Sequence, residues 1–255
     1  MSAFVDDLIA QVLTLDITLH ACRERLAART DSEALHDLRI ALRRLRSLLR
    51  PLRKVPAVEP LENAAKAVGK LSGPLRDDEV LLGELQRQGR HDLLTSRQAG
   101  LEHGYAALLA SAELRRLFQV LDAWPQLFRQ AQREQLLQGA RKRVGKTLAR
   151  QQRQLAEALR DPAHDRHRLR LLIKRMRYGS DAYPQLTGVA GADYAALKAA
   201  QSALGDWHDL MQWLARVERE AELAALAPLW QQALQAAEGK ADQALEPLLE
   251  RFTKS

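Results

Sequence analysis

The sequence is poor in cysteine and in aromatic residues: Cys22 is its only cysteine, and aromatics make up 5% of the chain. A single cysteine excludes an internal disulfide and a zinc site built from cysteines, and it fits a reducing compartment. No apolar run is long enough to cross a bilayer, and the first residues lack the basic and apolar regions of a secretory signal. We therefore expect a cytoplasmic protein with no integral membrane association.

The sequence also lacks any convincing alternation of apolar and polar residues of the kind that predicts a strand. Helix-forming residues dominate instead, with hydrophobic residues at 46% and charged residues at 28% of the 255 positions. This balance is typical of a globular protein. We expect an all-α fold that forms one domain over residues 1–255.

The positive charge is concentrated in two segments of a chain whose formal net charge is +7. Segment 36–54 holds seven Arg or Lys against one acidic residue, and segment 129–177 holds fifteen against four. The rest of the chain is therefore net acidic. This distribution predicts an anionic partner more strongly than the net charge does, because net charge alone mostly affects solubility and non-specific attraction.

The first basic segment has the spacing of an amphipathic helix. Leu38, Leu42, Leu45 and Leu49 recur at intervals of three and four, which predicts one buried face. The basic residues beside that face lie within an arc of roughly 80°; they are His36, Arg39, Arg43, Arg46 and Arg50. Like charges at this spacing cost roughly 0.2–0.5 kcal/mol per pair. Taken alone, such a row is most simply interpreted as a solvated face.

The same pattern recurs 131 residues later, which a solvated face does not require. Residues 35–47 correspond to 166–178, with both the basic and the apolar positions retained. The second row consists of His167, Arg170, Lys174 and Arg177. Residues 71–78 likewise resemble 203–210. We infer a duplication, with one pseudo-repeat over about 5–124 and the other over about 127–250.

The glycine and proline residues of the chain suggest where the helices of each repeat end. Gly73-Pro74, Pro125 and Gly205 are among the predicted helix breaks. Asp77 and Asp209 follow two of these glycines. Their default role is to stabilise the start of a helix, and the alternative is that they hold arginines of the rows in place.

A third basic row precedes the second repeat, at spacings of three and four. Its predicted binding residues are Arg143, Lys146 and Arg150, and Arg153 continues the row. These residues are interpreted either as a further wall of the same binding surface or as the outer face of a charged surface helix.

The repeated segments 36–46 and 167–178, each followed by a glycine turn and then Arg-Asp or His-Asp, resemble the CHAD family, the conserved-histidine α-helical domain. The resemblance extends over roughly residues 5–250. It implies two pseudo-symmetric four-helix bundles with a basic groove or pore where they meet. It also implies binding of inorganic polyphosphate and association with polyphosphate granules. The triphosphate-tunnel domain of some family members has no counterpart in this sequence, so we expect no enzymatic activity.

The residue types of the rows suit a chain of phosphates. Arginine stays charged at physiological pH and donates paired hydrogen bonds to phosphate oxygens, while Lys174 acts as a point charge. His36 and His167 gain charge as the pH falls, so we expect pH-sensitive binding. No cofactor and no metal are required for such a site.

Three other interpretations remain open. The pairs His36-Asp37, His91-Asp92 and His208-Asp209 are similar to metal-binding pairs of phosphohydrolases, but they are crowded by cations. Basic helices also suit nucleic acid, although the basic segments have few aromatic residues on which bases stack. Peripheral membrane binding is the least favoured, because the basic faces lack flanking Trp or Phe.

Overall fold

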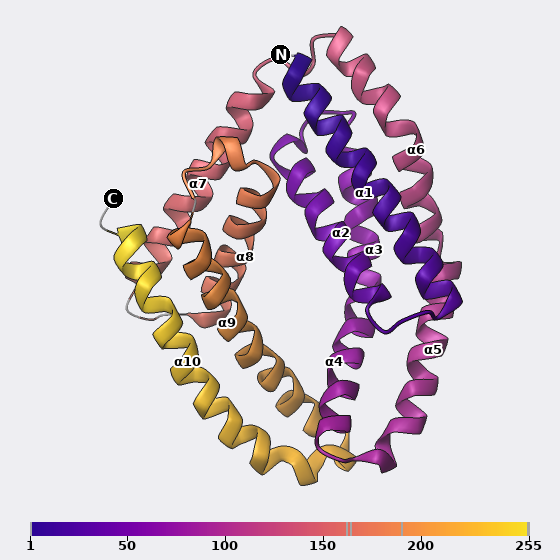
Figure 1. Cartoon of the computed structure of the whole chain (residues 1–255), viewed down its shortest axis with the longest axis vertical. Helices are drawn as coiled ribbons and strands as arrows, with labels where there is room; N and C mark the ends of the chain where they lie inside the picture. The colour runs from indigo at the N-terminus through magenta and orange to yellow at the C-terminus, as the bar shows by residue number, and fades with distance from the viewer. Residues whose placement is uncertain (1, 162, 164, 190, 254–255) are drawn as a thin grey trace. The chain divides into compact units, whose positions relative to one another are not determined.

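The computed structural model describes residues 2–161, 163, 165–189 and 191–253. Within these ranges every regular element is a helix and no strand is present, which confirms the all-α prediction. The α-helices of this part of the chain (Figure 1) are α1 (Ser2–Ala28), α2 (Ala34–Leu49), α3 (Glu59–Leu71), α4 (Gly73–Arg87), α5 (Leu94–Ala110), α6 (Ala112–Arg133), α7 (Ala140–Arg160), α8 (Arg166–Ala182), α9 (Ala192–Val217) and α10 (Ala227–Thr253). Short 3-10 helices are η1 (Arg50–Leu52), η2 (His91–Leu93), η3 (Pro184–Leu186) and η4 (Ala221–Leu226). None of the described helices combines the length and the apolar character that a membrane span needs.

The chain divides into two compact units, Met1–Val144 and Gly145–Ser255. The division falls inside α7, after its first few residues. We call these unit 1 and unit 2. The predicted pseudo-symmetry of the two halves, and the limits of the two pseudo-repeats, stay predictions.

Unit 1 is held together by leucine-rich helix faces. Helix α2 packs between α1 and α3, and α3 also packs on α6. The buried centre of α6 carries Trp124 and Phe128, whose rings stack with centroids 4.5 Å apart. Helices α4 and α5 pair with each other and prolong the unit. Burial of the α2 leucines confirms the face predicted from their spacing.

Unit 2 has a core made from four helices. Leu155 of α7, Ile173 of α8, Leu204 of α9 and Leu248 of α10 all belong to this core. Beyond it, α9 and α10 continue side by side, with Trp213 and Trp230 in ring contact at 5.5 Å. Trp124, Trp213 and Trp230 are buried, whereas Trp207 is only half-buried.

Two of the predicted helix breaks are wrong. Pro125 lies inside α6, and Gly205 lies inside α9. In α6 the stacked Trp124 and Phe128 hold the helix across the proline, and tertiary packing of this kind overrides local propensity. In α9 the apolar residues on both sides of Gly205 share one buried face, which keeps the glycine helical.

The matched glycine of unit 1 behaves differently. Gly73 begins the new helix α4, directly after Ser72, and Pro74 occupies the first turn. Proline has no backbone N–H and its ring clashes with the preceding turn, so it is accepted at a helix start but not in a helix interior. The residue of unit 2 that corresponds to Pro74 is Asp206, which keeps its N–H. The difference between Pro74 and Asp206 therefore explains why unit 1 has two helices, α3 and α4, where unit 2 has the single helix α9.

Candidate functional site

The two predicted basic rows lie on matching faces of α2 and α8, and the last residue of the first row, Arg50, begins η1 directly after α2. We call His36, Arg39, Arg43, Arg46 and Arg50 the α2 row, and His167, Arg170, Lys174 and Arg177 the α8 row. On a helical wheel both rows are centred about 120° from the direction of the buried leucine face. Most of their side chains are half-buried, and only Arg50 and His167 are exposed. The rows thus flank the core instead of pointing directly away from it.

Arg39 is tied into the fold more firmly than a surface cation. Its Nη1 donates to the carbonyl oxygen of Gly69 at 3.0 Å and to Oγ of Ser72 at 2.9 Å, at the junction of α3 and α4. Ser72 is fully buried. Burial, followed by repulsion from Arg43, lowers the pKa of Arg39 from its ordinary value. Arg39 therefore has a structural role that its place in a basic row did not indicate.

The fourth residue of each row connects its helix to the next one. Arg46 donates from Nη2 to Oε1 of Glu62 on α3, 3.2 Å away. Arg177 donates from Nε to Oε1 of Gln201 on α9, 2.7 Å away, and lies over the ring of Tyr178. The neighbouring helix thus occupies part of the hydrogen-bonding capacity of both guanidinium groups. Arg43, Arg170 and Lys174 lie one to two turns nearer the histidines.

In unit 1 the row is joined by a further cation from α4. This cation is Arg76. Burial, followed by the charges of Arg76 and Arg43, lowers the pKa of the His36 imidazole. Nη1 of Arg76 is 2.8 Å from Oε2 of Glu79, and the other oxygen of Glu79 accepts a hydrogen bond of 2.6 Å from Tyr105 on α5. This Tyr105–Glu79–Arg76 chain fixes the guanidinium beside the row. Arg76 was not among the binding residues predicted from the sequence.

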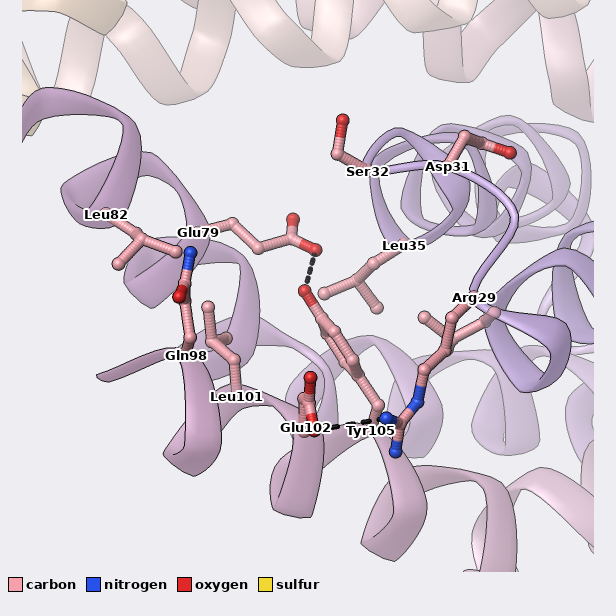
Figure 2. A pocket seen from close by; sticks show the side chains of 11 residues that line it. Arg29, Asp31, Ser32, Leu35, Glu79, Leu82, Gln98, Leu101, Glu102 and Tyr105 are labelled. Carbon is pink, nitrogen blue, oxygen red and sulfur yellow. Dashed lines mark hydrogen bonds and ion pairs between the residues drawn. The ribbon is translucent and has the colours of Figure 1, made fainter. Parts of the chain in front are cut away.

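Tyr105 and Glu79 also line a pocket of about 390 Å³, whose other residues come from α1, α2, α4, α5 and the α1–α2 connection. Figure 2 shows Tyr105 donating to Glu79, and Arg29 paired with Glu102. The Arg29–Glu102 distance is 3.0 Å. The third carboxylate of the pocket, Asp31, pairs with Arg25 at 2.7 Å. The wall of the pocket has more carboxylates than cations, so its charge has the wrong sign for an anionic ligand.

In unit 2 the matching position on α9 holds a histidine. His208 lies 5.9 Å from His167, measured between ring centroids, and is half-buried. Burial, followed by the charges of Arg170, His167 and Lys174, lowers the pKa of His208 to about 4. The α8 row and His208 together form one cationic surface over two helices, in which His208 is neutral at physiological pH. His208 was predicted from the sequence only as part of a candidate metal pair.

The default role predicted for Asp77 and Asp209, stabilising a helix start, is wrong. Asp77 is the fifth residue of α4, and Asp209 lies well inside α9. Neither is in a first turn, where exposed amides are available to a carboxylate. The charge of Asp77 instead raises the pKa of Arg39, in opposition to the effect of burial. This favours the supporting role for Asp77.

The third basic row, on α7, differs from the other two in exposure. Arg143, Lys146 and Arg150 are all exposed. On the helical wheel they lie opposite Val144, Leu148 and Leu155, which form the buried face of α7. This agrees with the interpretation of the row as the outer face of a charged helix.

The predicted metal pairs do not form a ligand cluster among the described residues. Asp37 is 2.8 Å from Nη1 of Arg25, and Asp92 is 2.7 Å from Nη2 of Arg90. The group of described side chains that does bring three potential ligands within 4.8 Å is elsewhere in unit 1 and consists of Asp16, His20 and Asp122. These residues combine one imidazole with two carboxylates and lie outside both rows.

This chain is similar in sequence and in fold to known proteins. The family model described as CHAD domain matches residues 15–218, which is most of the chain. The chain belongs to the CHAD family. Its fold is similar to the crystal structure of the CHAD domain from the plant Ricinus communis, with a TM-score of 0.69 and 24% sequence identity over 98% of this chain and 91% of the plant chain. No curated protein matches this sequence.

Within this CHAD domain, the internal repeat indicates two binding-surface residues that were not predicted as such from the sequence. Arg76 and His208 occupy the same position in the two copies of the repeated glycine-turn segment, one residue before Asp77 and Asp209. The repeat therefore marked the position. What the sequence did not show is that this position faces the basic row of a different helix.

Proposed function

We propose that this CHAD domain binds inorganic polyphosphate through two surfaces, the α2 row with Arg76 and the α8 row with His208. The observation that carries this proposal is that in each unit a half-buried cationic row meets a further basic residue from another helix at the same repeat position. A solvated helix face needs no such partner. Membership of the CHAD family is consistent with the proposal.

The electrostatics of the rows support a polyanion as the occupant. Like charges gathered on one face repel each other, and partial burial strengthens that repulsion because the local dielectric is lower than in water. A chain of phosphates relieves it at several positions at once. Arg43 and Arg170 suit paired hydrogen bonds to phosphate oxygens, and Lys174 suits a single charge contact.

Nucleic acid is the competing polyanion, and the placement of the aromatic residues argues against it. Binders of single strands stack bases on exposed aromatic platforms. Of the four tryptophans in this chain, Trp124, Trp213 and Trp230 are buried and Trp207 is half-buried, so none is an exposed platform. We therefore expect long-chain polyphosphate to displace single-stranded RNA of equal charge, and preferential retention of the RNA would favour the nucleic-acid alternative.

The binding test uses neighbouring residues on α8 as matched variants. Arg170→Glu with Lys174→Glu is expected to weaken polyphosphate binding by roughly tenfold or more, because charge-assisted hydrogen bonds each contribute about 1.5–3 kcal/mol. Arg175→Glu is the control, since Arg175 is exposed on the same helix but outside the row. Titration calorimetry gives the affinities, and circular dichroism shows whether the helices are retained. Equal losses in the double variant and the control would contradict the proposal.

We further propose that the protein binds without hydrolysing its ligand. No described metal-ligand group lies in either row, since Asp16, His20 and Asp122 are elsewhere. Incubation of polyphosphate with the protein and added Mg²⁺, Mn²⁺ or Zn²⁺ is expected to release no phosphate above the protein-free background. Release that is lost in the Asp16→Asn variant would instead show a metal-dependent hydrolase.

In the cell, the proposed function places the protein in the cytoplasm at polyphosphate granules. A fluorescent fusion is expected to form foci that coincide with polyphosphate staining. The Arg170→Glu, Lys174→Glu variant should be diffuse, and Arg175→Glu should still form foci. Foci that persist in the double variant would argue against recruitment by the α8 row.

A further inference from the structure

We infer, on the basis of the proposed function, that polyphosphate binding by unit 2 is coupled to proton uptake at His208, so that this unit binds the polyanion more tightly as the pH falls. The coupling is stronger in unit 2 than in unit 1, which has Arg76 at the matching position. The two units thus combine a pH-dependent surface with one whose charge is largely fixed.

The geometry behind this inference is the pairing of two imidazoles inside a cationic surface. The rings of His167 and His208 have centroids 5.9 Å apart and come from different helices, α8 and α9. The positive charges of Arg170 and Lys174 both lower the pKa of the His208 imidazole. Placing a further positive charge on a half-buried ring in this company is unfavourable unless an anion is present.

The groups around His208 come from α8, α9 and α10. Helix α8 contributes His167, Arg170 and Lys174, which are cations or potential cations. On α9 itself, the ring of Trp207 lies 6.4 Å from that of His208, and Asp209 follows in the chain. Helix α10 packs along α9, and its ring contact there is apolar, between Trp230 and Trp213. The charges that act most on His208 are therefore those of the α8 row.

The ligand-free protein should hold His208 neutral over the physiological range. Burial and the three α8 groups lower its pKa to about 4, compared with about 6.5 for a free imidazole. A phosphate chain on the α8 row offsets the repulsion from Arg170 and Lys174, and its oxygens accept a hydrogen bond from the protonated ring. The pKa of His208 therefore rises on binding. By linkage, a pKa that rises on binding means that the complex takes up protons and that affinity increases as the pH falls.

Unit 1 provides an internal comparison. Arg76 carries a permanent charge at the repeat position of His208, and its ion pair with Glu79 holds it in place. Among the described residues of unit 1, the imidazole beside the α2 row is that of His36, whose pKa is lowered by burial, Arg76 and Arg43. One of the two titratable positions of unit 2 is therefore fixed as a cation in unit 1.

The test measures protons directly. Calorimetry with long-chain polyphosphate, in two buffers of different ionisation enthalpy at about pH 6, gives the number of protons taken up per complex. We expect net uptake by the intact chain. His208→Arg should take up fewer protons and should bind more tightly near neutral pH, because the missing charge is then supplied permanently.

Two further variants keep the test independent of any one substitution. His208→Gln removes the titration without adding charge, so its proton uptake should fall and its affinity should rise less as the pH is lowered. Arg76→His converts unit 1 to the pattern of unit 2, so its proton uptake should increase and its affinity near neutral pH should fall. Circular dichroism at each pH establishes that the variants are folded.

The outcomes separate this inference from the proposed function. An intact chain that binds no polyphosphate at any pH would overturn both. Binding with the same proton uptake in the intact chain, His208→Arg and His208→Gln would overturn the coupling and leave polyphosphate binding in place. A His208 ring that titrates near pH 6.5 without ligand, followed by NMR, would equally contradict the coupling.

Discussion

One arginine of the basic rows, Arg39, contributes to the fold as well as to the positive charge. Arg39 has the same spacing as its neighbours, yet it satisfies a backbone carbonyl and the buried hydroxyl of Ser72. A buried acceptor that loses its donor pays the full cost of desolvation. Residues of one row can therefore have different consequences when substituted, even though they carry the same charge.

Replacing Arg39 by alanine is expected to lower the free energy of unfolding by about 1–3 kcal/mol, because Gly69 and Ser72 lose their donor. Arg44→Ala should change it by less than about 0.5 kcal/mol, since Arg44 is exposed outside the row. Urea denaturation followed by circular dichroism measures both. Equal stability of the two variants would mean that the Arg39 hydrogen bonds add nothing to the fold.

At the scale of the helix, the difference between Pro74 and Asp206 decides how many elements each unit has. Pro74 stands in the first turn of α4, while Asp206 lies inside the continuous α9. The continuous helix α9 of unit 2 therefore contains core residues as well as His208 and Trp213. In unit 1 the corresponding residues are divided between α3 and α4. Arg39 donates hydrogen bonds to Gly69 and Ser72 where these two helices meet.

Asp206→Pro is expected to destabilise the protein by about 3 kcal/mol or more, because it removes one helical hydrogen bond and places a ring against the preceding turn. Asp206→Ala is the control and should leave α9 intact. Thermal melts and helical circular dichroism provide the readout. A proline variant as stable as the alanine variant would show that α9 tolerates a break where unit 1 has one.

Helices α2 and α8 could be predicted from the sequence because the apolar and basic positions of the first recur 131 positions later in the second. The breaks at Pro125 and Gly205 were predicted wrongly, because packing around Trp124 and along α9 outweighs local propensity. The contribution of Arg76 and His208 could not be predicted, since it depends on how α4 meets α2 and α9 meets α8. Periodicity describes one helix and contains no information on which neighbour it faces.

For the whole molecule, the charge is distributed so that two basic segments lie within an otherwise acidic chain. Long-range attraction of an anion by such segments is screened by salt, with a Debye length of about 8 Å at physiological ionic strength. The proposed binding should therefore depend strongly on salt. This separates it from binding through the pocket of unit 1, whose carboxylates outnumber its cations.

The logarithm of the polyphosphate affinity is expected to fall by about 0.7 per phosphate neutralised for each tenfold increase in salt, if the value for single-stranded nucleic acid applies. The Arg170→Glu, Lys174→Glu variant should give a shallower slope, and Arg175→Glu should keep the original one. Titrations over a series of NaCl concentrations measure the slopes. A flat response of the intact chain would rule out a phosphate track as the basis of binding.

The ring contact between Trp207 and His208 has a practical consequence. Protonated imidazole quenches indole emission, and the two rings are 6.4 Å apart on consecutive residues of α9. The other tryptophans are buried in the two cores. Acidification or ligand addition should therefore dim the fluorescence contributed by Trp207, which gives the protein a built-in optical reporter that needs no label.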